Sequence, residues 1–122
     1  MPENDPLTER IIGSAFQVAN TLGHGFLEKV YENALVHELR KAGLRVDQQQ
    51  GLEVHYDGII VGEFQVDLLV EGQVLVELKV VSSLQDVHVA QCLNYLKASA
   101  KPVCLLFNFG KSLQVRRLML GK

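Results

Sequence analysis

Two apolar runs separated by Glu71-Gly72 constrain the fold of this chain more than any other feature. Residues 66–70 and 74–80 both carry apolar side chains at every second position, which is typical of strands that bury one face. Burying both runs on the same side requires even-numbered residues to pair with even-numbered residues. A two-residue loop would put the apolar faces on opposite sides. We therefore predict a three-residue loop, Val70-Glu71-Gly72, with Gly72 in the left-handed conformation.

The opposite face of this hairpin gathers charge at the end away from the turn. It carries three charged residues, Asp67, Glu77 and Lys79, together with Gln65, Leu69 and Leu75. Same-face neighbours on a strand lie roughly 6.5–7 Å apart, which lets carboxylate oxygens converge on one hard cation beside an ammonium group. The alternative is a half-solvated face with an ordinary Glu–Lys pair. The two leucines favour the first interpretation, because charges kept on a covered face usually have a function or a partner.

The other segments predict helices and strands around the hairpin. Helices are expected over 8–22, 26–42 and 84–99, the first capped by Thr8 and the last by a capping box at Ser83–Asp86. Strands are expected over 44–56 with a break at Gly51, from 59 into the hairpin, and over 103–107 and 113–120. A strand, a helix and a fully apolar strand predict a right-handed crossover that makes 74–80 and 103–107 parallel neighbours.

These elements predict an α/β or α+β fold with the order α-α-β-β-β-α-β-β. Its sheet is an antiparallel meander plus one parallel strand, flanked by helices. We expect a flexible tail over 1–7 and a single domain over 8–120, because 122 residues suffice for only one core.

Composition excludes several classes of protein. A net charge of −2 and a pI of about 6.1 argue against a protein that coats nucleic acid by charge alone. Cys92 and Cys104 lie in apolar stretches without metal-binding spacing, so buried free thiols in a reducing compartment are expected. The acidic N-terminal residues do not form a signal peptide, and no apolar run reaches transmembrane length. We therefore expect a cytoplasmic protein without a membrane partner.

Two helices add polar candidates. Glu28 and Tyr31 follow Gly25 at intervals of three, so they lie nearly in line on one helix face. A later polar stripe comprises His88, Gln91 and Tyr95, which the functional interpretation directs at the charged face of the hairpin. The alternatives are a solvated acid favoured by the helix dipole, and an exposed helix face with a tyrosine whose hydroxyl reaches water.

The sequence also carries the pattern of a known family. Residues 25–31 read Gly-Phe-Leu-Glu-Lys-Val-Tyr, and further similarity includes Glu77-Leu78-Lys79 and Asn108-Phe109-Gly110. On these residues the chain resembles the GxxExxY protein family of small prokaryotic proteins, over about Thr8 to Leu118. That family is placed in the PD-(D/E)xK nuclease-like superfamily, whose core has the order α-β-β-β-α-β.

The resemblance implies a restriction-endonuclease-like core and a metal-dependent nuclease site. Asp67 and Glu77 match the metal-binding acids of the superfamily, and the carbonyl of Leu78 would assist them. Lys79 matches the catalytic lysine, and Glu28 matches the helical acid that often completes the metal site. The implied cofactor is Mg²⁺ or Mn²⁺.

The match extends to the later helix and includes two departures. Gln91 and Tyr95 match helix residues that flank the superfamily's site. Val66 stands where the superfamily name has proline, and Gln65 stands where many family members have arginine. Because Gln65 is expected on the charged face, the missing positive charge would weaken a phosphate contact.

Three functional hypotheses follow. The first is a Mg²⁺- or Mn²⁺-dependent phosphodiesterase acting on DNA or RNA, in which Lys79 assists the attacking water and Gln91 positions the water or the phosphate. The second is a non-catalytic interaction domain, which the acidic pI favours. The third is an obligate homo-oligomer whose site is shared between chains, which an exposed Arg116–Arg117 strand edge allows.

Overall fold

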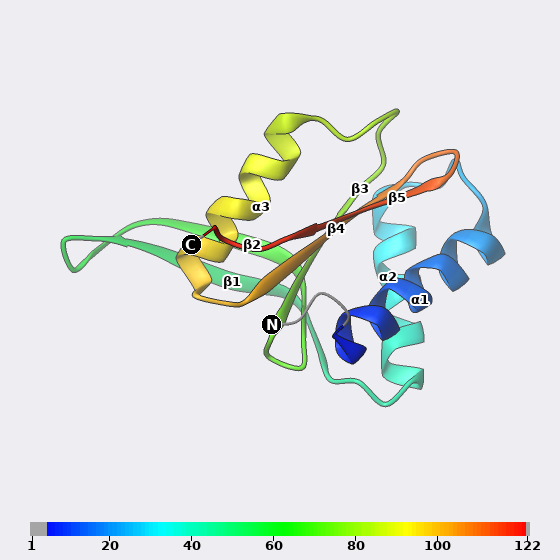
Figure 1. Cartoon of the computed structure of the whole chain (residues 1–122), viewed down its shortest axis with the longest axis horizontal. Coiled ribbons are helices and arrows are strands. Elements are labelled where there is room, and N and C mark those ends of the chain that lie inside the picture. The colour runs from blue at the N-terminus through cyan, green and yellow to red at the C-terminus, as the bar shows by residue number, and fades with distance from the viewer. Residues whose placement is uncertain (1–4, 122) are drawn as a thin grey trace.

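The computed structural model describes residues 5–121 and contains a five-stranded sheet with helices on both faces (Figure 1). The sequence order matches the predicted order. The elements are α1 (Pro6–Leu22), α2 (Glu28–Lys41), β1 (Val46–Tyr56), β2 (Ile59–Val70), β3 (Val74–Lys79), α3 (Asp86–Ser99), β4 (Val103–Phe109) and β5 (Leu113–Leu118).

The sheet has the predicted mixture of pairings. Its strand order is β1-β2-β3-β4-β5, and every neighbouring pair is antiparallel except β3 and β4, which are parallel and joined by α3. This is the predicted meander with one parallel strand, an α+β arrangement consistent with a restriction-endonuclease-like fold.

Two apolar clusters fix the helices to the sheet. One lies between the sheet and helices α1 and α2, and it includes Ile11, Leu35, Leu68, Val76 and Phe107. The other lies between the sheet and α3, and it includes Val66, Leu69, Leu75, Leu96 and the predicted buried free thiols Cys92 and Cys104. The central strands therefore bury both faces, and every residue of β4 is buried.

The central hairpin confirms the predicted pairing parity. Its register pairs Leu68 with Val76 and Val70 with Val74, so even residues oppose even residues. The unpaired residues are 71–73 rather than the predicted Val70-Glu71-Gly72. Glu71 and Gly72 both have positive φ, and the Gln73 N–H donates to the Val70 carbonyl. The loop thus begins with a two-residue turn at Glu71 and Gly72. Gln73 is one extra unpaired residue, and it lets even-numbered residues pair with even-numbered residues.

The prediction that Val66, Leu68 and Val70 share one buried face is wrong. Val66 belongs to the cluster under α3, whereas Leu68 and Val70 belong to the cluster under α1 and α2. Strand β1 changes face over the same stretch, because Val46 packs with the α2 cluster and Leu52 with the α3 cluster. The irregular residue between them is Gln49, which has φ of 55°. The faces of β1 and β2 that pack on each cluster therefore exchange near Gln49. The predicted break at Gly51 is absent, because Gly51 pairs with Gln65 within the strand.

Several predicted boundaries also shift. Helix α1 begins at Pro6, because Asp5 rather than Thr8 is the N-cap and accepts a bond from the Thr8 N–H. Residues 5–7 of the predicted flexible tail are therefore ordered into or against α1, while residues 1–4 lie outside the described residues. Helix α3 begins at Asp86, and its capping box is formed by Gln85 and His88 instead of Ser83 and Asp86. Within residues 5–121, no helix has the length and apolar character needed to span a membrane.

Candidate active site

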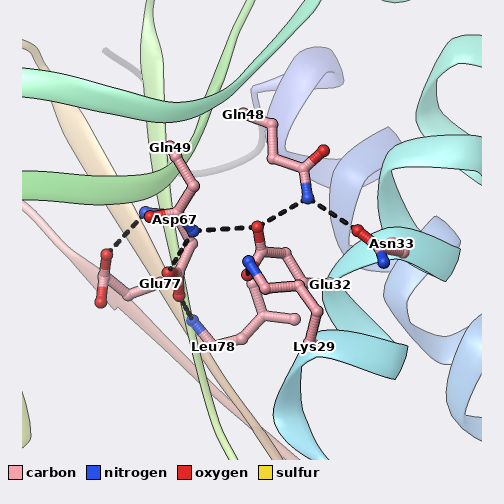
Figure 2. A network of polar contacts seen from close by, with 8 residues as sticks. All are labelled: Lys29, Glu32, Asn33, Gln48, Gln49, Asp67, Glu77 and Leu78. Atoms are coloured by element: carbon pink, nitrogen blue, oxygen red, sulfur yellow. Dashed lines mark hydrogen bonds and ion pairs between the residues drawn. The ribbon is translucent and has the colours of Figure 1, made fainter.

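The strongest candidate site lies where β2 and β3 separate. The register of the hairpin places Asp67 opposite Glu77, but ladder pairing stops one position earlier, at Leu68 and Val76. Side chains replace the missing ladder: the Asp67 N–H donates to Glu77 Oε1, and the Leu78 N–H donates to Asp67 Oδ2, each at 2.8 Å (Figure 2). Two carboxylates thus occupy the gap between strands, each held by a main-chain amide of the other strand.

Burial and mutual repulsion make the doubly ionised form of Asp67 and Glu77 unfavourable. The Glu77 residue is only 4% exposed, and its burial, followed by the charge of Asp67, raises its pKa to about 8. Burial also raises the pKa of Asp67, although the hydrogen bond from Leu78 opposes the shift. Like charges directly opposite one another across a strand pair are destabilising without a compensating cation.

Lys79 and Glu28 interact electrostatically with the acid pair. Lys79 is half-buried at the end of β3. Its positive charge opposes the rise in pKa that burial causes in three carboxyl groups: Asp67, Glu77 and Glu28. Glu28 begins α2, and partial loss of solvent, followed by the charge of Asp67, raises its pKa. The helix and the hairpin therefore bring these four side chains into one electrostatic group.

A second acid on α2 is missing from the sequence prediction. Glu32 is 1% exposed and accepts hydrogen bonds from Lys29, Gln48 and Gln49 at 3.0, 2.7 and 2.9 Å. Burial alone would raise the pKa of Glu32, but these hydrogen bonds outweigh it and lower the pKa. Gln49 Nε2 also lies 3.3 Å from Asp67 Oδ1, so it links Glu32 to the acid pair (Figure 2). The available signal was the spacing of Glu28 and Glu32, which places them one turn apart on the same helix face.

The donor chemistry of this group fits a hard divalent cation. Carboxylate oxygens are available on Asp67 and Glu77, and burial, together with neighbouring acids, raises the pKa of both groups, so a bound cation would offset the cost of ionising them. Within residues 5–121, no three carboxylate, imidazole or thiol groups stand close enough to hold an ion by themselves. Mg²⁺ commonly binds through one or two carboxylates and keeps several waters, so two acids are a sufficient protein contribution.

Tyr31 has a structural role in the loop before Glu28. Its hydroxyl donates to the Gly23 carbonyl at 2.7 Å and accepts from the Phe26 N–H at 3.2 Å. Its ring is fully buried and stacks on Phe109, with the ring centroids 4.7 Å apart. Gly25 has φ of 111°, a conformation that suits glycine. The glycine and the tyrosine of the 25–31 motif therefore fix the loop that sets the start of α2.

Replacing Tyr31 by phenylalanine should lower the free energy of unfolding by roughly 1–3 kcal/mol, because two main-chain groups lose their buried partner. Urea denaturation measures the change. Tyr56→Phe is the matched control, since Tyr56 is 74% exposed and its loss should cost at most about 0.5 kcal/mol. Equal effects of the two substitutions would contradict this role for Tyr31.

The two candidate residues Tyr95 and Gln91 on α3 differ in their surroundings. Tyr95 is buried, and its pKa rises to about 12 because of burial and then the charges of Glu77 and Asp67. Gln91 lines a cavity of about 690 Å³ that Tyr95 and Phe64 also line, between α3 and the β1–β2 ribbon.

Two further predicted residues have contacts of their own. His88 Nδ1 accepts the Gln85 N–H at 3.0 Å, so this side chain caps α3. Gln65, expected beside the acids, lines another cavity of about 990 Å³ together with Leu69 and Ser99. The structure therefore brings Glu28, Lys79 and Tyr95 within electrostatic reach of the Asp67–Glu77 pair, whereas Gln91, His88 and Gln65 have cavities or contacts elsewhere.

Comparison with known proteins gives one match. A family model described as the PD-(D/E)XK nuclease superfamily matches residues 5–118, nearly the whole chain. No curated protein and no solved structure gives a significant match.

Proposed function

The chain belongs to the PD-(D/E)XK nuclease superfamily, and from this premise we propose that it is a divalent-metal-dependent phosphodiesterase acting on DNA or RNA. One observation carries the proposal: Asp67 and Glu77 face one another where β2 and β3 part, in the same electrostatic group as Lys79. Within the superfamily, we propose that the chain is a member of the GxxExxY family, and the motif at residues 25–31 supports this.

Asp67 and Glu77 would hold the metal, which we propose is Mg²⁺ or Mn²⁺. The Leu78 N–H points at Asp67, and in a strand the carbonyl of the same residue projects to the same side. The Leu78 carbonyl therefore has the direction needed to assist. Glu28 would contribute a third carboxylate through water, whereas the three donors on Glu32 leave that acid engaged within the protein.

The bound cation would supply Lewis acidity toward a phosphoryl oxygen. Lys79 would offset the negative charge that develops on the phosphoryl group in the transition state, and it would orient the attacking water. Gln91, which lies on α3 beside Tyr95, would position the water or the phosphate. Pairing with β4 fixes the backbone of Glu77 and Lys79, and the two hydrogen bonds across the gap hold Asp67 against β3.

Incubation with Mn²⁺ and with plasmid DNA, single-stranded DNA or RNA tests the proposal. Wild-type protein should cleave at least one substrate, and a chelator should abolish the cleavage. Asp67→Asn should reduce the rate by roughly 10²-fold or more, since it removes a metal ligand. Asp57→Asn is the matched control at the exposed β1–β2 turn and should leave the rate unchanged. No cleavage by wild type, or equal rates for the two variants, would contradict the proposal.

A non-catalytic binding domain is the second candidate. The observation that favours it is the engagement of both site carboxylates with main-chain amides, in a chain with a net charge of −2. Thermal unfolding separates the two candidates. Without metal, Asp67→Asn should raise the melting temperature in either case, because it removes charge repulsion. Saturating Mn²⁺ should stabilise wild type more than the variant only if Asp67 binds the ion.

A further inference from the structure

Gln49 has an unusual backbone conformation for its position. It lies within the eleven-residue strand β1, yet its φ is 55°, a left-handed conformation that costs a non-glycine residue about 1 kcal/mol or more. The pairing of β1 with β2 includes Gln48 with Leu68 and Gln50 with Val66, and it omits Gln49 with Asp67 between them. The strained residue, Gln49, therefore lies across from Asp67, one of the two acids of the site.

This conformation lets two consecutive side chains reach the same acid. Neighbouring residues on a regular strand point to opposite faces of the sheet. Here Gln48 Nε2 and Gln49 Nε2 both donate to Glu32 Oε2, at 2.7 and 2.9 Å (Figure 2). A regular strand at Gln49 would direct its amide away from Glu32 and the α2 face.

Glu32 fixes the direction of the Gln49 amide. Its second carboxylate oxygen accepts from Lys29 Nζ at 3.0 Å, so the acid is held from both sides and is 1% exposed. Since a carboxylate accepts hydrogen bonds only, the Gln49 amide must direct its NH₂ group toward Glu32. The same NH₂ group lies 3.3 Å from Asp67 Oδ1, the oxygen that the Leu78 N–H leaves free.

We propose that Gln49 is a positioning residue for the metal-binding carboxylate of Asp67, with Glu32 as its anchor. This inference rests on the proposed function. Two donors hold the two oxygens of Asp67: the main-chain N–H of Leu78 on one, and the Gln49 amide on the other. The long Gln49 contact restrains Oδ1 without competing strongly with a cation, because hydrogen bonds weaken beyond about 3.2 Å. Groups that orient ligands in this way change metal affinity by roughly 10–100-fold when they are removed.

The test compares Gln49→Met with Gln48→Met. Methionine is similar in length and also has a Cβ, so the left-handed strain stays, but its side chain donates no hydrogen bond. Both variants remove one donor from Glu32, and only Gln49→Met removes the donor to Asp67. Gln49→Met should weaken Mn²⁺ binding, measured by calorimetry, about tenfold or more, and Gln48→Met should change it by at most about twofold. Gln49→Asn, which tolerates the left-handed conformation but is too short to bridge, should behave like Gln49→Met.

Crystal structures of the metal-free proteins separate failure of this inference from failure of the proposed function. In Gln49→Met the Asp67 carboxylate should rotate or become disordered, and in Gln48→Met it should keep the wild-type orientation. Wild-type protein that binds no Mn²⁺ would refute the metal-dependent function. An unchanged Asp67 carboxylate in Gln49→Met, or equal losses of Mn²⁺ affinity in the two methionine variants, would overturn the role of Gln49.

Discussion

Lys79→Ala should reduce Mn²⁺-dependent cleavage by roughly 10²–10³-fold, the effect of removing one group that stabilises transition-state charge. The protein should remain folded, because the lysine is only half-buried at the end of its strand. Mn²⁺ affinity should be maintained or increased, since the substitution removes a positive charge that repels the cation near Asp67 and Glu77. A lower turnover with preserved metal binding would assign Lys79 to the chemical step.

The matched control for this prediction is Lys41→Ala. Lys41 lies in the last turn of α2, at the end opposite Glu28, and pairs with Glu38 at 2.9 Å. Its replacement should leave cleavage and Mn²⁺ affinity unchanged, and surface ion pairs of this kind contribute at most about 1 kcal/mol to stability. Full turnover in Lys79→Ala, or a loss shared equally by both variants, would contradict the assigned role.

Glu77→Gln should make the metal-free protein more stable at pH 8, by roughly 3–5 kcal/mol relative to wild type. The folded-state pKa of Glu77 is about 8, whereas the ordinary value of 4.5 applies to the unfolded chain. The folded protein therefore favours the protonated form. The resulting stabilisation is complete below pH 4.5 and is lost as the pH rises through about 8. Glutamine keeps an oxygen for the Asp67 N–H and cannot ionise, so its advantage should grow over this pH range.

Urea denaturation of wild type and Glu77→Gln at intervals from pH 4.5 to 8.5 measures this difference. Saturating Mn²⁺ should reverse it at pH 8, because the cation binds the ionised acid and stabilises wild type only. A constant difference between the two proteins across the pH range would show that Glu77 does not titrate abnormally. It would remove the electrostatic argument for a cation in the gap.

The hairpin at 66–79 and its pairing parity could be predicted from the apolar residues at alternate positions. Alternating apolar residues on both runs fix the parity of pairing, but the predicted loop would have placed Asp67 opposite Leu75, and only the observed register brings Asp67 opposite Glu77. The parallel β3–β4 pair follows from the fully apolar strand after a helix, and the structure confirms it. The acids and the lysine at the strand ends could therefore be named from sequence, and their convergence with Glu28 on one cation stays a prediction.

The reversal of the β1–β2 ribbon could not be predicted, because its cause is one left-handed glutamine. Glycine is the usual sign of such a conformation, and Gly51 lies two residues away in a regular stretch of strand. Nothing in the residue type of Gln49 reveals its φ, so Val66 was assigned to the wrong face. The link from Glu32 through Gln49 to Asp67 was hidden for the same reason.

Helix ends were the other weak point, because several polar residues competed for each cap. Ser83 and Asp86 have better capping statistics than Gln85, yet the structure uses Gln85 and His88 to start α3. Asp5 likewise replaces Thr8 at the start of α1. Each error moved a boundary by two or three residues without changing the order of the elements.

Diffraction from crystals soaked in Mn²⁺, with anomalous data collected near the manganese absorption edge, tests the central claim most directly. We predict one strong anomalous peak in the gap between β2 and β3, at bonding distance from a carboxylate oxygen of Asp67 and of Glu77. A map without a peak in that gap at saturating Mn²⁺, or with manganese bound only at other acids, would contradict the assignment of this site.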